Sequence, residues 1–250
     1  NSDYEEGSPR STDGQMGMDA KVAITSSLNL DLTINPDFSQ VEVDQQVTNL
    51  TRFNVRFPER RLFFLENSDL FQDFGIPPMR PFFSRRIGLD ENNQPVPIQF
   101  GARLSGNVNP NLRIGVLNIQ TGSTADLLAQ NYSAAVFQQR VLARSTIRGY
   151  VHNRQAMADG KLAEGDYGRN AGLEFAYLSG DGKWRSFTGL GYSFHDQQNR
   201  DNYFYQVGIG YDGRNLSAYT NLAGIGNNYL ADIGFMPRQG HYDAKADTTY

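Results

Sequence analysis

Apolar and polar residues alternate along much of the chain with a period of two. The pattern is clearest in residues 22–34, where the apolar positions are Val22, Ile24, Leu28, Leu30, Leu32 and Ile34. Such alternation is typical of a β-strand with one apolar and one polar face, so we predict a single long strand over residues 22–34. At ~3.3 Å per residue and a tilt of ~40°, this strand would cross the ~25 Å apolar band of an outer-membrane barrel.

A turn is predicted directly after this strand. Asn35, Pro36 and Asp37 stop the alternation, because proline donates no ladder hydrogen bond, and residues 41–44 restart it as a return strand. The carboxylates near this turn are Asp31, Asp37, Glu42 and Asp44. Hard oxygen ligands could hold Ca²⁺ there, but the spacing is not that of an EF-hand loop and the invariant glycine of such a loop is missing. We therefore interpret them as turn carboxylates and predict no metal site.

The alternation returns at residue 98 and repeats at the spacing of successive hairpins. It predicts strands over residues 98–108, 112–120, 132–142, 146–153, 173–178, 184–194, 203–211, 216–222 and 229–236. Asp181-Gly182 and Asp212-Gly213 favour tight hairpin turns, because both residue types tolerate a positive φ. The fold class we predict is all-β, an antiparallel up-and-down sheet of roughly ten to twelve strands.

Two segments depart from this pattern. Residues 1–19 are rich in Ser, Asp, Glu and Gly and predict a flexible linker before a barrel domain over residues 20–250. Residues 56–81 mix phenylalanine with charge and end in several prolines. We expect an ordered insertion there, with one short helix over residues 66–71, folded into the lumen or over one mouth of the barrel.

Several motifs around the insertion resemble those of a known family. They are NPDFSQVEVD (residues 35–44), FPERRLFFLENSDLF (residues 57–71) and FFSRRIG (residues 82–88). The chain resembles an uncharacterised family of Gram-negative outer-membrane proteins in which a family-nine-type carbohydrate-binding domain precedes a large β-barrel. The resemblance implies a bacterial outer-membrane location, part of a larger barrel, and lipid and envelope proteins as partners. It also implies glycan binding through a domain outside these residues, and it implies no reaction.

Composition narrows the function classes. No stretch of 18 apolar residues is present, so the sequence predicts no transmembrane helix. The net charge of -4 gives no nucleic-acid footprint, and the absence of cysteine excludes disulfides and thiolate metal sites. Soluble β-sandwiches and propellers alternate in the same way, so a soluble binding module stays open as an alternative.

Charged residues crowd the predicted insertion. The candidate residues are Glu59, Arg60, Arg61, Glu66, Asp69, Arg85 and Arg86. Carboxylates flanking a bond are what glycoside hydrolysis needs, so a surface glycan hydrolase is the alternative function. We interpret the neighbouring arginines instead as ion-pair partners that fix the insertion against the barrel wall, and we assign no catalytic residue and no cofactor.

The remaining titratable residues give no metal or triad spacing. His152, His195 and His241 do not form an HxxxH or HExxH motif. The strand arginines are Arg103, Arg113, Arg140, Arg148 and Arg154, and we expect them to pair with lumen carboxylates such as Asp31 and Glu174 or to tune solute selectivity. The function we predict is a non-enzymatic outer-membrane β-barrel that acts as a pore, transporter or surface-assembly component.

Overall fold

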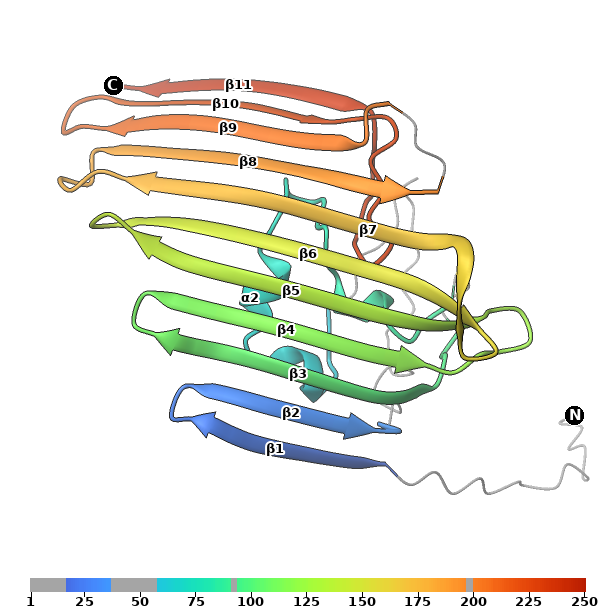
Figure 1. Ribbon diagram of the computed structural model, residues 1–250. Helices are drawn as coiled ribbons and strands as arrows, with labels where there is room; N and C mark the ends of the chain where they lie inside the picture. The colour runs from blue at the N-terminus through green and yellow to red at the C-terminus, as the bar shows by residue number, and fades with distance from the viewer. Residues whose placement is uncertain (1–16, 37–57, 91–93, 197–199) are drawn as a thin grey trace, which may run out of the picture.

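The computed structural model describes residues 17–36, 58–90, 94–196 and 200–250. Eleven antiparallel strands form one sheet whose order follows the chain from β1 to β11 (Figure 1). They are β1 (Met18–Thr25), β2 (Leu28–Ile34), β3 (Ile98–Asn109), β4 (Leu112–Thr121), β5 (Ala129–Val141), β6 (Ser145–Ala158), β7 (Lys161–Leu178), β8 (Trp184–His195), β9 (Tyr203–Asp212), β10 (Ser217–Ile225) and β11 (His241–Thr249). The predicted all-β up-and-down architecture is confirmed. The sheet does not close among the described strands, and β1 and β11 form its two edges.

The two ends of the sheet carry different connections. At one end, which we call the short-turn end, residues 26–27, 110–111, 142–144, 179–183 and 213–216 join the strands. At the other, which we call the long-loop end, four of the five connections are longer, residues 35–97, 122–128, 196–202 and 226–240, and the fifth is the two-residue turn 159–160. Figure 1 shows the short-turn end at the left.

The predicted single strand over residues 22–34 is wrong, because the chain turns at residues 26–27 and β1 and β2 form a hairpin. Val22 pairs with Leu30 across this hairpin. Residues that pair across two strands lie on the same face of the sheet. The apolar residues of β1 and β2 therefore share one face, and the sequence pattern shows no break at the turn. The apolar residues assigned to one face therefore do lie on one face.

The predicted strand over residues 229–236 is also wrong. These residues lie in the connection between β10 and β11, and the last strand is β11. Tyr229 and Ile233 are buried in the core, and Phe83 donates its backbone N–H to Ile233 O at 2.7 Å. The apolar spacing of this segment reflects contact with the insertion. The predicted strands over 146–153 and 173–178 exist but are longer, as β6 and β7.

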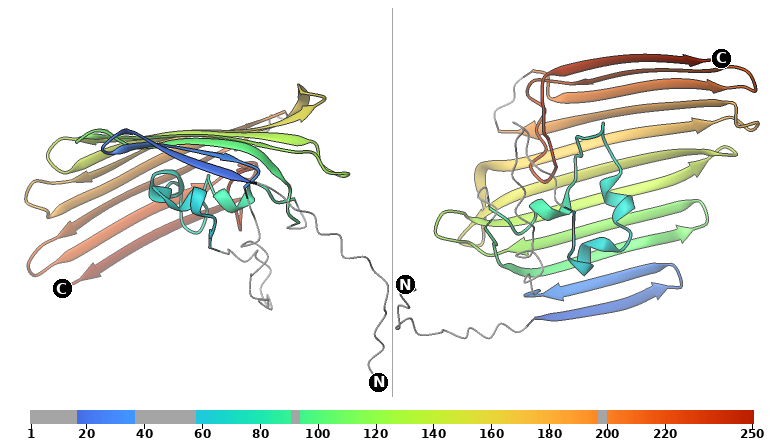
Figure 2. Two further views of the ribbon diagram at one scale, coloured as in Figure 1. Left: turned by 90° about the horizontal axis from the view of Figure 1, so that it is seen from below. Right: turned by 180° about the vertical axis from the view of Figure 1, so that it is seen from behind.

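The insertion lies under one face of the arched sheet, which we call the inner face (Figure 2). Its helices are α1 (Leu62–Leu65), α2 (Ser68–Gln72) and the 3₁₀ helix η1 (Ser84–Arg86). The helix predicted over 66–71 begins only at Ser68, as α2. A second helix, α1, precedes it, and Glu66 and Asn67, the latter at a φ of 50°, lie between the two. The ordered insertion continues past residue 81, through η1 to residue 90. No described helix is long and apolar enough to span a membrane.

The core forms between the insertion and the inner face. Phe71, Phe74 and Phe82 of the insertion pack in one cluster with Ile119 of β4 and Tyr150 of β6. Of the predicted linker, residues 1–16 lie outside the described residues, as does the predicted return strand over 41–44, and Met18 already begins β1. The insertion and the sheet thus share one hydrophobic core.

Candidate functional site

The face opposite the insertion, which we call the outer face, is apolar and exposed. Leu173 and Leu190 form a cross-strand pair at its centre and are 55% and 58% exposed. Other exposed apolar residues of this face are Val22, Ile24, Leu32, Phe100, Val116, Val151, Val207, Ile209 and Leu222. The alternation places them on one side of their strands, from β1 to β10. No described segment covers this face (Figure 2).

Aromatic residues border the aliphatic centre at both ends of the outer face. Trp184 and Tyr211 lie at the short-turn end with ring centroids 4.9 Å apart. Tyr192 and Phe194 lie toward the long-loop end at 4.8 Å. The outer face is therefore an aliphatic band flanked by rings.

Polar side chains follow the aliphatic band at the long-loop end of β4 to β7. Asn118 donates a hydrogen bond to Ser133 Oγ at 3.1 Å, and Arg169 donates one to Asn153 Oδ1 at 3.1 Å. The apolar surface thus ends in a ladder of amides, a hydroxyl and a guanidinium.

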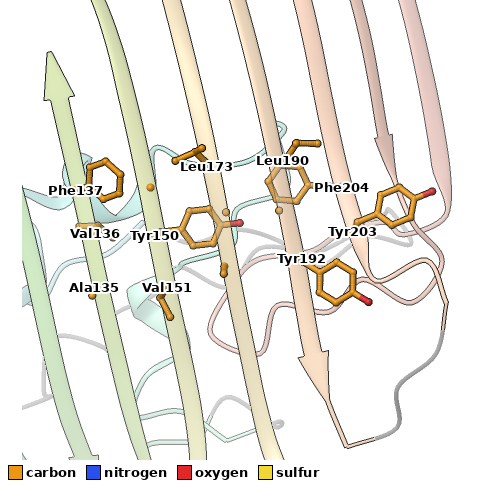
Figure 3. Close-up of a pocket in the computed structure, with 14 residues that line it drawn as sticks. Ala135, Val136, Phe137, Tyr150, Val151, Leu173, Leu190, Tyr192, Tyr203 and Phe204 are labelled. Carbon is orange, nitrogen blue, oxygen red and sulfur yellow. The ribbon is translucent and has the colours of Figure 1, made fainter. Parts of the chain in front are cut away.

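A groove of about 710 Å³ interrupts the bulky side chains at the centre of the outer face. Figure 3 shows Phe137, Leu173, Leu190, Tyr192 and Tyr203 around it. The strands between them carry small residues, including Ala135, Gly149 and Ala171. The lining is almost wholly apolar, so the groove fits a hydrocarbon chain and offers no polar anchor.

Behind the groove, Tyr150 of β6 lies across β7 on the inner face (Figure 3). A Cβ on Gly172 would lie 2.4 Å from the Tyr150 ring, and one on Gly191 would lie 2.2 Å from the Phe204 ring. Only glycine allows these rings to lie flat on the backbone. The sheet is therefore thin and closely packed at this point.

The inner face carries buried charge. Arg103 is 3% exposed, donates to Asp31 Oδ2 at 2.8 Å through Nη2, and donates to Glu66 O at 2.7 Å through Nη1. Arg148 donates to Glu174 Oε2 at 2.5 Å. The predicted pairing of strand arginines with Asp31 and Glu174 is thus confirmed for these two.

Glu174 also joins the sheet to the insertion. Its Oε1 accepts the backbone N–H of Gly75 at 2.8 Å, and Glu174 is 1% exposed. Because an ion pair and an amide satisfy both carboxylate oxygens, this buried charge fixes the insertion to β7.

The carboxylates Glu66 and Asp69 of the insertion pair with residues of the sheet. Asp69 accepts from Arg113 Nη1 at 2.7 Å, and Glu66 contacts Lys21 and accepts from Asn29 Nδ2 at 3.1 Å. The sequence predicted insertion arginines as partners instead. These partners lie on β1, β2 and β4, far from the insertion in sequence, so the sequence did not reveal them.

Glu59 keeps its predicted partner within the insertion. Its Oε2 accepts from Arg61 Nη2 and from Ser84 Oγ, both at 2.7 Å. Arg61 also donates to the carbonyls of Ile87 and Ser84. Arg85 is 7% exposed and donates to Pro58 O at 3.0 Å, whereas Arg60 lies at the surface and its N–H donates to Glu59. Arg86 faces a cavity at the long-loop end.

The pKa values of these carboxyls are all lowered. Burial alone would raise the pKa of Glu59, but the hydrogen bonds and charge of Arg61 outweigh burial. The Lys21 ammonium lowers the pKa of Glu66, and the Arg113 guanidinium lowers the pKa of Asp69. All three groups are therefore held ionised, as structural ion pairs require.

Metal ligation finds no support in the described residues, which contain no cluster of three or more His, Asp or Glu suited to an ion. Of the predicted turn carboxylates, Asp31 pairs with Arg103, and Asp37, Glu42 and Asp44 lie outside the described residues. Sequence reasoning missed Asp232, which binds Arg154 Nε at 2.8 Å from the connection between β10 and β11.

Comparisons with known proteins give one match. The family described as "Domain of unknown function (DUF5916)" matches the chain over residues 1–146. No curated protein matches the chain, and no solved structure does. The match spans the insertion and the first strands of the sheet.

Proposed function

The chain belongs to the family described as a domain of unknown function (DUF5916), and we propose that it forms part of the wall of a plugged outer-membrane β-barrel that admits solutes. One observation carries this proposal. The outer face is apolar and uncovered, whereas the inner face buries ion pairs and the insertion. A soluble antiparallel sheet that packs one face on its core has a polar face toward water, not an apolar one.

The size of the outer face supports contact with lipid. Strands lie ~4.8 Å apart, so ten spacings make this face roughly 50 Å wide. Monomeric soluble proteins rarely expose contiguous apolar patches beyond ~300–600 Å². In lipid the same leucines and valines cost nothing, and the flanking Trp and Tyr rings suit the two membrane interfaces.

The connections support the same orientation. Outer-membrane barrels have short turns on the periplasmic side and longer loops outside. The short-turn end and the long-loop end of this sheet match that asymmetry at every connection but the turn 159–160. We therefore assign the short-turn end to the periplasm.

The insertion defines the transport role. In a closed barrel it would stand in the lumen, held by Glu174, Arg103 and Arg113. A solute would then pass beside the insertion or after its displacement. The association with a glycan-binding domain rests on the resemblance of the sequence motifs alone.

The two alternatives fit less well. A glycosidase needs a general acid with a raised pKa, whereas the pKa values of Glu59, Glu66 and Asp69 are lowered. A soluble β-sandwich needs a second layer over its apolar face, and the described residues supply none.

The proposal is tested by refolding the full chain in detergent micelles and, separately, in detergent-free buffer. A compact gel band that forms only in detergent and shifts on boiling is the expected result. A monodisperse protein that melts cooperatively in plain buffer contradicts the proposal and favours a soluble β fold.

Solute passage is measured separately, by swelling of liposomes that contain the refolded chain. Deletion of residues 58–90 should speed swelling in a small neutral solute, because the plug is removed. Equal, background swelling of both proteins, each shown to be inserted, contradicts the pore role.

A further inference from the structure

A cavity of about 350 Å³ opens on the inner face near the long-loop end. The wall supplies Tyr132, Arg154 and Asp166, the insertion supplies Arg86, and the connection between β10 and β11 supplies Asp232. Its volume lies at the lower end of the ~300–1,000 Å³ range of small-molecule sites. Polar and apolar surface line it about equally.

Arg154 is held rigidly at one side of this cavity. Its Nε donates to Asp232 Oδ2 at 2.8 Å, and its Nη1 donates to Asp166 Oδ1 at 2.6 Å and to Gln130 Oε1 at 3.0 Å. Asp232 in turn sits over Gly168, where a Cβ would lie 2.0 Å from Oδ2. The charges of this cluster are thus fixed before any ligand arrives.

Other polar atoms at the cavity are unused by the described residues. Tyr132 is 6% exposed, yet its hydroxyl makes no hydrogen bond to the described part of the protein. Arg86 is exposed to the cavity and forms no ion pair or side-chain hydrogen bond with described residues. The Tyr132 hydroxyl and the Arg86 guanidinium are therefore available to hydrogen-bond to a ligand or to water in the cavity.

Acceptors accompany these donors. Asp166 binds Arg154 through Oδ1 only, which leaves Oδ2 of a half-exposed carboxylate facing solvent. Asp232 Oδ1 lies 3.9 Å from His195 Nδ1, beyond hydrogen-bond distance. The charges that act on the Tyr132 hydroxyl are Arg86, Arg154, Asp166 and Asp232. Donors and acceptors therefore line the same cavity.

The balance of charge selects the ligand class. An anion would meet Asp166, Asp232 and Asp90, and a cation would meet Arg86. A neutral hydroxyl both donates and accepts, so a ligand rich in hydroxyls satisfies every unused group. Leu89, Leu127 and the Tyr132 ring offer apolar surface for its carbon skeleton. We infer that this cavity binds one ring of a neutral saccharide.

This inference goes beyond the proposed function and does not depend on lipid contact at the outer face. Saturation-transfer NMR on the folded full chain tests it with glucose, galactose, mannose, xylose and arabinose as probes, and with inorganic phosphate as the anionic probe. We expect at least one sugar to bind and phosphate not to bind. Binding of phosphate without any sugar, or binding of none of these probes, overturns the inference.

Variants locate the site. Tyr132→Phe removes only the hydroxyl and keeps the buried ring, so it should fold and weaken sugar binding roughly 3- to 10-fold, the loss of one neutral hydrogen bond. Arg86→Gln should weaken it at least as much. Tyr203→Phe, on the outer face, is the matched control and should bind as the natural chain does. Sugar binding that neither Tyr132→Phe nor Arg86→Gln changes overturns the assignment.

Discussion

The two faces of the same sheet obey opposite rules. On the outer face Leu173 and Leu190 are more than half exposed, whereas on the inner face Arg103 and Glu174 are 3% and 1% exposed. Both patterns come from the alternation of side chains along the strands. In water this arrangement would expose apolar surface and desolvate charge at the same time. The alternation decides which residues share a face, and the medium around the outer face decides whether exposing its apolar residues is stable.

The inner face makes its charges tolerable by pairing them. Arg103 has Asp31 and a backbone carbonyl as partners, and Glu174 has Arg148 and a backbone amide. Buried charges are stable in proteins when hydrogen-bonded partners surround them. The outer face has no comparable partners for its apolar groups among the described residues, so lipid is the partner that we propose.

The largest expected effect is at the buried inner face. Arg103→Met should lower the free energy of unfolding by ~3–5 kcal/mol, because Asp31 is left buried without a partner. Urea titration in micelles, followed by Trp184 fluorescence, measures it. Arg169→Met at the exposed rim of the outer face is the matched control and should cost under ~1 kcal/mol. Equal losses would mean that the two faces do not differ in charge burial.

The next effect is at the centre of the outer face. Leu173→Arg should cost ~2–4 kcal/mol if the band meets hydrocarbon, because a guanidinium is expensive near the bilayer midplane. Leu162→Arg, at the start of the same strand, lies outside the band and should cost ~0–1 kcal/mol. Both substitutions would be nearly neutral on a water-exposed face. Unfolding titrations of the two variants in lipid bicelles decide between the media.

A smaller effect is expected where the wall is thin. Gly172→Ala would place a Cβ 2.4 Å from the Tyr150 ring, and we expect a loss of ~1–3 kcal/mol from overpacking. Gly180→Ala, whose Cβ would meet nothing within 4 Å, serves as control. A thermal melt of both variants measures the difference, and a Gly172→Ala protein as stable as the control would argue against this packing.

The smallest effect concerns the pH dependence of stability that comes from the partly exposed ion pair of Asp69 and Arg113. The folded-state pKa of Asp69 is lowered below 3.8, so its contribution is complete above that value and is lost as the pH falls through the folded pKa. Because both side chains are partly exposed, we expect only ~0.2–1 kcal/mol. Asp69→Asn should remove this acid-sensitive part, and 1 M salt should shrink it. A pH dependence of stability that Asp69→Asn leaves unchanged would contradict a stabilising role for this ion pair.

Alternation alone predicts most of the sheet, because side-chain faces follow from the backbone period. It misses the turn at Ser26 and Ser27, because the apolar residues before and after this turn lie on the same face. It also predicts a strand at Tyr229 and Ile233, which are buried although they lie in a connection. A period of two shows which residues share an environment, but a connection that packs against the core can produce the same pattern as a strand.

Ion pairs of the site could be predicted only where both residues lie on the polar faces of strands. That strand arginines pair with Asp31 and Glu174 followed from the polar faces of the strands, whereas the structure shows that the partners are Arg103 and Arg148. Lys21 with Glu66 and Arg154 with Asp232 did not follow in this way, because each pair depends on how a long connection folds back onto the sheet. The same reason hid the cavity at Tyr132.

The single tryptophan gives the most direct test of the central claim that the outer face meets lipid. Trp184 lies on this face at the short-turn end and is 48% exposed. In vesicles, its fluorescence should be quenched by labels on lipid chains, more strongly by a label near the headgroup than by one at the chain end. Quenching by aqueous iodide with no quenching by any lipid label would contradict the account.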